Sequence, residues 1–287
     1  MSSRERHLVL TITCTDRTGL IYEIAGEFST RGWNIDDSQQ FADPLTHTFF
    51  MRVEASRVAA DGEVEALEQA LRARAAAGSM IVGLYDAEAR QRLLILVSRI
   101  GHCLNDLLFR QATGQLHADV AAVVSNHPDL GPVARANGVA FHHLPVGPDN
   151  RAEQEAEILA LVDKLQVDLV VLARYMQILS PSLVEALAGR AINIHHSFLP
   201  SFKGANPYRQ AFERGVKVIG ATAHFVTSDL DEGPIIEQEV TRVDHRMSPA
   251  RLAALGQANE SAALARAVTW QLEHRVFLNG NRAVVFR

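Results

Sequence analysis

The chain has 287 residues, of which 47% are hydrophobic and 21% charged, a balance typical of a folded protein rather than a disordered one. Its formal net charge of -5 argues against a broad basic surface for nucleic acid. No apolar run approaches the length of a membrane span, and the first residues lack a signal-peptide core. With only Cys14 and Cys103, far apart in the sequence, a reducing cytoplasm is favoured over a disulfide framework.

The first part of the chain carries the pattern of a ferredoxin-like βαββαβ unit. Alternating or β-branched runs predict strands, and apolar residues at helical spacing predict two helices between them. The expected strands are 7–14, 33–42, 46–53 and 80–84, and the expected helices are 20–31 and 62–77. We therefore expect a first domain at residues 1–85, followed by a short polar linker at 86–91.

The second part, residues 92–287, alternates strands with helices, which predicts a doubly wound, mainly parallel α/β sheet. Strands are expected at 93–98, 120–125, 139–144, 169–172 and 191–194, with the clearest helix at 152–164. Two later strands, 216–226 and 235–240, are joined by a turn and should pair antiparallel. A long helix at 249–273 and a hairpin at 275–286, turning at Asn279-Gly280, complete the chain.

Polar residues at the end of one apolar strand indicate a catalytic site. Asn193 and His195 are two positions apart, so both side chains point to the same side of the strand. Taken alone, each residue has a purely structural interpretation, as a turn residue or a hydrogen-bonded histidine. A second apolar run leads to Asp231, whose carboxylate can return to the same edge of the sheet. Amide, imidazole and carboxylate together suit acyl chemistry, since they can polarise a carbonyl and move a proton.

The motifs NIHHSFLPSFKGANPY (193–208) and HFVTSDLDEGPII (224–236) resemble the formyltransferases that use formyltetrahydrofolate. The resemblance covers residues 92–287 and implies that Asn193, His195 and Asp231 are catalytic, with His224 in support. The segment LARYMQIL (172–179) is similar to the one that lines the family's pterin pocket. It implies a substrate-binding stretch that includes Met176, Gln177 and Leu179, with Gln177 standing where the family commonly has arginine.

The N-terminal motif LTITCTDRTGLIYEIAGEFSTRGWNI (10–35) resembles an ACT domain, a small-molecule sensor module. Its turn Asp16-Arg17-Thr18-Gly19 leads into a helix N-terminus, which favours an anionic or carboxylate ligand. The resemblance makes methionine and glycine candidate effectors and predicts a homo-oligomer. The alternative is that this domain serves only to pair subunits.

An ACT domain joined to a formyltransferase-like domain, with the segment SRIGHCLNDLLFR (98–110), resembles the formyltetrahydrofolate deformylase family. That segment offers Arg99, His102 and Cys103 where a transformylase needs a small-residue loop for its acceptor's phosphate. The resemblance implies hydrolysis of 10-formyltetrahydrofolate to tetrahydrofolate and formate, a reaction of one-carbon metabolism connected with purine biosynthesis. In this hypothesis Asp231 activates a water, while Asn193 and protonated His195 stabilise the oxyanion.

Three further residues are expected to have supporting roles: His102 beside the vacated acceptor space, and Lys203 and Gly204 at the loop lip. The folate is the substrate, so no separate cofactor is expected. No metal is expected either, because the paired histidines have no cysteine or carboxylate at zinc-binding spacing. Two other functions stay open: a transformylase that passes the formyl group to an amine, and a non-catalytic sensor of folate or amino acids. The complete set Asn193, His195 and Asp231 argues against the sensor.

Overall fold

The computed structural model describes residues 4–199 and 207–287. They divide into two compact units, each considered separately here: one contains the residues up to Ala89 with Glu273–Asn279 and Val284–Arg287, and the other contains Arg90–Leu272 with Gly280–Ala283. Among the described residues, every helix is too short or too polar to cross a bilayer.

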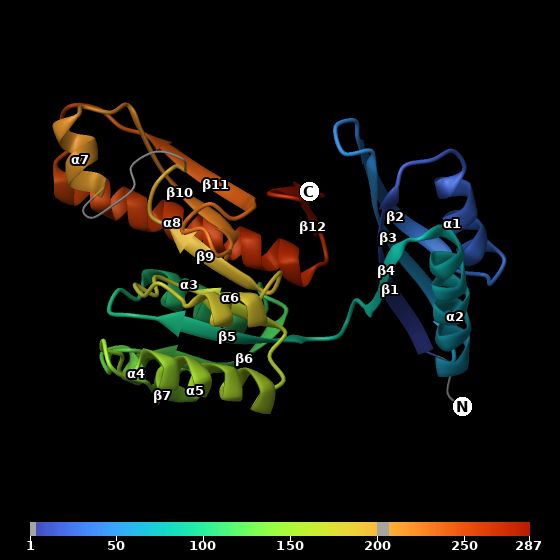
Figure 1. Cartoon of the computed structure of the whole chain (residues 1–287), viewed down its shortest axis with the longest axis horizontal. Helices are drawn as coiled ribbons and strands as arrows, with labels where there is room; N and C mark the ends of the chain where they lie inside the picture. The colour runs from blue at the N-terminus through green and yellow to red at the C-terminus, as the bar shows by residue number, and fades with distance from the viewer. Residues whose placement is uncertain (1–3, 200–206) are drawn as a thin grey trace. The chain divides into compact units, whose positions relative to one another are not determined.

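The first unit is a four-stranded antiparallel sheet with two helices on one face (Figure 1). The elements are β1 (Arg4–Thr15), α1 (Leu20–Ser29), β2 (Asn34–Asp43), β3 (Thr48–Ala59), α2 (Asp61–Gly78) and β4 (Ile81–Asp86), and the strand order is β2-β3-β1-β4. Alternate residues of β1, such as Leu10 and Ile12, point into a core that α1 completes with Ile24 and Phe28. The predicted ferredoxin-like unit is confirmed.

A C-terminal hairpin packs against this first unit. Its strands β12 (Val276–Asn279) and β13 (Arg282–Val285) meet at Gly280, whose φ of 61° is the left-handed conformation that the turn requires. Phe277 and Phe286 pack on Phe50, and the Asn279 amide donates to Asp43 at 2.5 Å.

This placement of the hairpin differs from the expected domain boundary, which assigned every residue after 91 to the second domain. The physical reason is that β3 has two apolar faces. Phe49 and Met51 point toward α1 and α2, whereas Phe50 points to the opposite face and needs another cover. The hairpin's phenylalanines supply it.

The second unit has a seven-stranded sheet in the order β11-β10-β9-β8-β5-β6-β7. Its strands are β5 (Gln91–Val97), β6 (Ala118–Ser125), β7 (Phe141–His143), β8 (Leu169–Leu172), β9 (Ala191–His195), β10 (Val218–Phe225) and β11 (Ile235–Arg242). Its helices are α3 (His102–Ala112), α4 (Gly131–Ala136), α5 (Arg151–Lys164), α6 (Pro181–Ala186), α7 (Pro207–Glu213) and α8 (Pro249–Leu272). Pairing is parallel from β7 to β9, and β10-β11 is antiparallel, as the sequence predicts. The pairing of β9 with β10 is also antiparallel.

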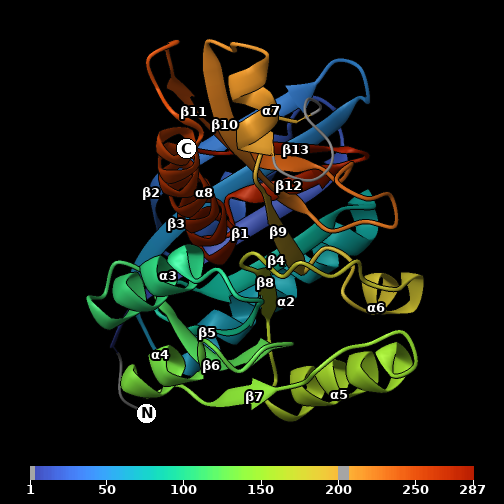
Figure 2. The ribbon, with the colours of Figure 1, turned by 90° about the vertical axis from the view of Figure 1, so that its left-hand side faces the viewer.

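Helices cover both faces of this sheet, with α5 and α6 on one side and α3 and α8 on the other (Figure 2). Leu94 and Leu96 of β5 pack toward α5 and α6, and Leu93 and Ile95, which alternate with them along the strand, are equally buried on the opposite face. The chain order reverses at β5, since β6 follows on one side and β8 lies on the other. Ligands bind at such a switch point, beyond the carboxyl ends of the strands.

Candidate active site

A cavity of about 280 Å³ lies at the carboxyl ends of β8 and β9. Its lining comes from within residues 172–179, 193–196 and 224–231, together with Val184. Asn193, His195, His224 and Asp231 are all among these residues, although Asn193 and Asp231 are far apart in the sequence. The structure therefore brings the predicted catalytic residues and His224 together in one cavity.

Strand register places His224 beside Asn193. The two residues are directly opposite each other in the antiparallel pairing of β9 and β10, so their side chains share one face. The Nδ1 of His224 bonds to the carbonyl oxygen of Phe225 at 2.9 Å, and its Nε2 lies 3.2 Å from the Nδ2 of Asn193. With its proton on Nδ1, His224 accepts from the Asn193 amide through Nε2 and fixes which way the amide faces.

His195 and Asp231 form the second contact in the site. The Nδ1 of His195 lies 3.2 Å from Oδ2 of Asp231, and the Nε2 of His224 lies 3.7 Å from Oδ1. The His195 side chain is buried, and its Nε2 has no hydrogen-bond partner among the described residues. One ring nitrogen of His195 is thus held by the carboxylate, and the other is available to a ligand.

Electrostatics keep Asp231 ionised. Burial by itself raises the pKa of the Asp231 carboxyl, but the neighbouring imidazoles of His195 and His224 lower the pKa well below its ordinary value of 3.8. The charged carboxylate is therefore the working form at neutral pH.

The loop that carries Asp231 depends on a glycine. Asp231 has a φ of 58°, a conformation that aspartate tolerates better than most residues. At Gly233, a Cβ would lie 1.8 Å from the carbonyl oxygen of Phe225, the same oxygen that binds His224. Only glycine lets the chain pass this close, so Gly233 supports both Asp231 and His224.

The predicted substrate-binding residues Met176, Gln177 and Leu179 also line the cavity. This segment is fixed by hydrogen bonds to Ser98, the residue that follows β5: the Met176 N–H donates to Ser98 Oγ at 3.0 Å, and the Ser98 N–H donates to the Arg174 carbonyl at 3.2 Å. The position of the segment is thus set by the neighbouring strand.

Sequence reasoning missed a buried ionic cluster centred on Glu260 of α8. Glu260 Oε2 lies 2.7 Å from His102 Nε2 and 3.3 Å from Arg174 Nε, and Oε1 accepts from the Tyr208 hydroxyl at 2.5 Å. Burial raises the pKa of Glu260, yet His102, Arg174 and Tyr208 together lower it below its ordinary value. The available signal was a carboxylate at helical spacing with Leu252 and Gly256 on the apolar face of a long helix.

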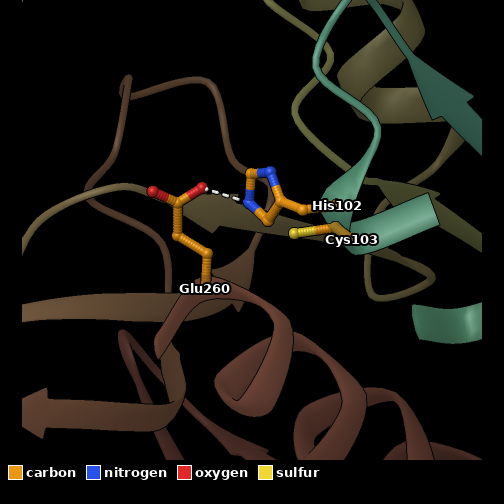
Figure 3. A group of neighbouring side chains, drawn as sticks. All are labelled: His102, Cys103 and Glu260. Atoms are coloured by element: carbon orange, nitrogen blue, oxygen red, sulfur yellow. Dashed lines mark hydrogen bonds and ion pairs between the residues drawn. The ribbon is translucent and has the colours of Figure 1, made fainter. Parts of the chain in front are cut away.

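His102 therefore lies at the start of α3 with its ring directed at Glu260, and the Cys103 thiol lies next to both (Figure 3). These three residues place potential metal-ligand atoms within 4.8 Å of one another. Two features oppose a cation: Arg174 competes for the same carboxylate oxygen, and burial raises the pKa of the Cys103 thiol, which keeps it protonated. We retain the expectation of no metal.

The remaining predicted residues lie elsewhere. Asp16, Arg17, Thr18 and Gly19 form the exposed turn before α1, with Gly19 at its N-cap. The Arg17 guanidinium contacts Glu23 of the first helical turn at 2.6 Å, so a carboxylate of the protein already occupies this end of the helix. Lys203 and Gly204 lie outside the described residues.

Comparison with known proteins identifies the family of each part of the chain. Residues 91–268 match the formyl transferase family and residues 6–85 match the ACT domain, so fold and site define a formyltransferase-type protein with an ACT domain. A formyltetrahydrofolate deformylase from Corynebacterium sp. (strain P-1) is 46% identical over 287 residues, covering 100% of both chains. The crystal structure of formyltetrahydrofolate deformylase from Burkholderia mallei is 48% identical, with a TM-score of 0.93, covering 98% of this chain and 100% of that one.

A glycinamide ribonucleotide transformylase from Symbiobacterium toebii is a more distant match. It is 33% identical with a TM-score of 0.65, and it covers only 69% of this chain and 95% of its own. The chain belongs to the formyltetrahydrofolate deformylase family.

Proposed function

We propose that this protein hydrolyses 10-formyltetrahydrofolate to tetrahydrofolate and formate. The observation that carries the proposal is the convergence of Asn193, His195 and Asp231 on one cavity. Full-length similarity to proteins named formyltetrahydrofolate deformylase supports the choice of substrate.

In the proposed mechanism, the formyl carbonyl lies against the Asn193 amide and the free Nε2 of His195. Asp231 accepts a proton from a water as that water attacks the formyl carbon. The tetrahedral intermediate carries a negative oxygen, which Asn193 and protonated His195 stabilise. Each such hydrogen-bond donor typically raises kcat by a factor of about 10²–10³. Protonation of the folate nitrogen then breaks the carbon–nitrogen bond.

A carboxylate with a lowered pKa is a weak base, and the developing charge compensates for this. In the resting site the Nδ1–H of His195 stabilises the Asp231 anion. As the oxyanion forms, the positive charge of His195 interacts with it and stabilises the Asp231 anion less. The pKa of Asp231 therefore rises, and Asp231 becomes a stronger base, as the water is deprotonated.

Water rather than an amine is the proposed acceptor because the N-terminal end of α3 presents bulky side chains. His102 is engaged by Glu260, and Cys103 is buried beside it. This arrangement differs from the open small-residue loop that would cradle a nucleotide acceptor's phosphate.

The test is formate release from 10-formyltetrahydrofolate by purified protein with no added acceptor. We expect stoichiometric formate and tetrahydrofolate, with no acceleration by glycinamide ribonucleotide. Turnover that requires the amine would instead make the protein a transformylase, and binding without turnover would make it a sensor.

For the ACT domain, we propose regulation by a small amino acid, with methionine and glycine as the ligands to test, and assembly into a homo-oligomer through the sheet edges β2 and β4. Ile81, on the edge strand β4, is 75% exposed in the chain, which supports an apolar contact there. Repeating the assay with each amino acid, and measuring the mass in solution, tests these proposals.

Both cysteines are free thiols, which fits a proposed cytoplasmic location.

A further inference from the structure

Arg174 stands out as a buried cation whose hydrogen-bonding capacity is largely unused. Its side chain is only 10% exposed, and neither Nε nor Nη1 has a hydrogen-bond partner within residues 4–199 and 207–287. Leaving donors of a charged group buried and unpaired costs free energy, so a native structure that keeps them requires an explanation.

The carboxylate of Glu260 does not satisfy the hydrogen-bonding capacity of Arg174. Glu260 lies 3.3 Å from Arg174 Nε, without the geometry of a hydrogen bond, and the same carboxylate serves His102 and Tyr208. Glu260 balances the charge of Arg174 but does not use its Nη1 donors.

The backbone holds Arg174 at this position. Its φ of 67° is a conformation that a non-glycine residue rarely adopts, and its carbonyl is anchored by the Ser98 N–H at 3.2 Å. The residue also lines the cavity that contains His195 and Asp231. An unusual conformation is therefore maintained at the wall of the reaction cavity.

We propose that Arg174 forms a subsite for a small carboxylate, and that its ligand during turnover is the formate released by the reaction. The identity of this ligand rests on the proposed hydrolysis. Water oxygen bonds to the formyl carbon, the bond from that carbon to the folate nitrogen breaks, the nitrogen gains a proton, and formate departs as an anion with one proton released.

The chemistry explains why a cation is useful here. The formyl group of the substrate is neutral, whereas formate carries a full charge in a cavity that also contains the Asp231 carboxylate. A guanidinium with free N–H donors binds a planar carboxylate well and gains little from the neutral substrate. Because Glu260 already offsets part of its charge, Arg174 holds formate weakly enough for release.

The experiment is a titration of the protein with ¹³C-formate, followed by NMR line broadening. It uses the wild type, the Asp231→Asn variant, and an Arg174→Met/Glu260→Gln double variant that removes both members of the buried pair together. Arg174→Lys keeps the charge, and Arg266→Met removes another arginine paired with a glutamate, Glu237 at 3.1 Å.

We expect saturable formate binding in the wild type and in the Asp231→Asn and Arg266→Met variants. Affinity should fall at least tenfold in the double variant, with an intermediate loss in Arg174→Lys. Absence of saturable binding in the wild type, or unchanged affinity in a folded double variant, would overturn the proposal.

Tetrahydrofolate also carries carboxylates, in its glutamate moiety, so it is titrated in parallel. Simultaneous binding of formate and tetrahydrofolate, with tetrahydrofolate affinity unchanged in the double variant, supports the formate subsite. Loss of tetrahydrofolate affinity with formate binding intact would assign Arg174 to the folate and contradict the proposal. Hydrolysis without formate binding would remove this inference alone, whereas Arg174-dependent formate binding without hydrolysis would remove only the proposed function.

Discussion

The Asn193 amide and the His224 imidazole lie 3.2 Å apart because strand pairing places the two residues opposite each other. His224 is in turn fixed by the Phe225 carbonyl at 2.9 Å. The orientation of a group proposed to bind the oxyanion therefore depends on a residue that need not touch the substrate. In that arrangement His224 is a positioning residue.

Replacing His224 with alanine should lower kcat about five- to tenfold, because losing one hydrogen bond costs roughly 1 kcal/mol of amide orientation. KM should change little. Steady-state kinetics on the His224→Ala variant, with His142→Ala as a control on the edge strand β7, checks this. An equal loss in both variants would point to general destabilisation.

The Asp231→Asn variant should lose about 10²–10⁴ in kcat, since the amide cannot accept the proton of the attacking water. Tetrahydrofolate binding should stay close to that of the wild type, because the segment that includes Met176 and Leu179 is untouched. Formate release and equilibrium binding measure the two effects separately. Near-normal turnover would remove Asp231 from the mechanism.

The pKa of Asp231 predicts a pH dependence of stability. The folded-state pKa lies below the ordinary value of 3.8, so the ionised carboxylate stabilises the fold above that pH. This contribution is lost as the pH falls through the folded-state pKa. Urea unfolding of the wild type and Asp231→Asn should show a constant difference in free energy from pH 7 to about pH 4, narrowing only below that. A difference that disappears between pH 7 and pH 5 would mean that Asp231 is not held ionised.

Truncating Glu260 to alanine should destabilise the second unit by about 3–5 kcal/mol, because it leaves Arg174 as an uncompensated buried charge. The matched control is Glu213→Ala, which removes a glutamate whose contact with Arg209 is on the surface, with side chains 58% and 75% exposed. That variant should lose no more than about 0.5 kcal/mol. Denaturant unfolding compares the two, and similar losses would contradict the buried-cluster interpretation.

The C-terminal hairpin should stabilise the first unit. Phe277 is 7% exposed and packs on Phe50 and Phe286. The Phe277→Ala change should therefore lower the free energy of unfolding by about 3–5 kcal/mol. Its neighbour Leu278 is 46% exposed, so Leu278→Ala should change stability by less than about 0.5 kcal/mol. Hydrogen exchange of β3 amides in both variants locates the effect, and an unchanged β3 in Phe277→Ala would show that the hairpin does not support this unit.

Local sequence was sufficient for most elements of both units. Period-two runs such as β1 and helical spacing such as that of Leu20, Ile24 and Phe28 are set by which faces must be buried. The Asn279-Gly280 turn was predictable because few dipeptides adopt its backbone conformation. The spacing of Asn193 and His195 placed both on one face of a strand for the same geometric reason.

Other features depended on contacts between segments that are distant in the sequence. Nothing near Phe50 indicates that a hairpin more than 200 residues later covers it. The Glu260 cluster likewise joins α3, α7, α8 and the segment after β8, and no single one of them shows a ligand pattern. The sequence by itself determined the secondary structure and the fold class, because strand and helix periods are local properties, and the resemblance of its motifs to a known family pointed to Asn193, His195 and Asp231. Only the tertiary structure decided how Asp231 is held, what surrounds Arg174 and which unit the tail joins, because side-chain partners are selected by packing in three dimensions.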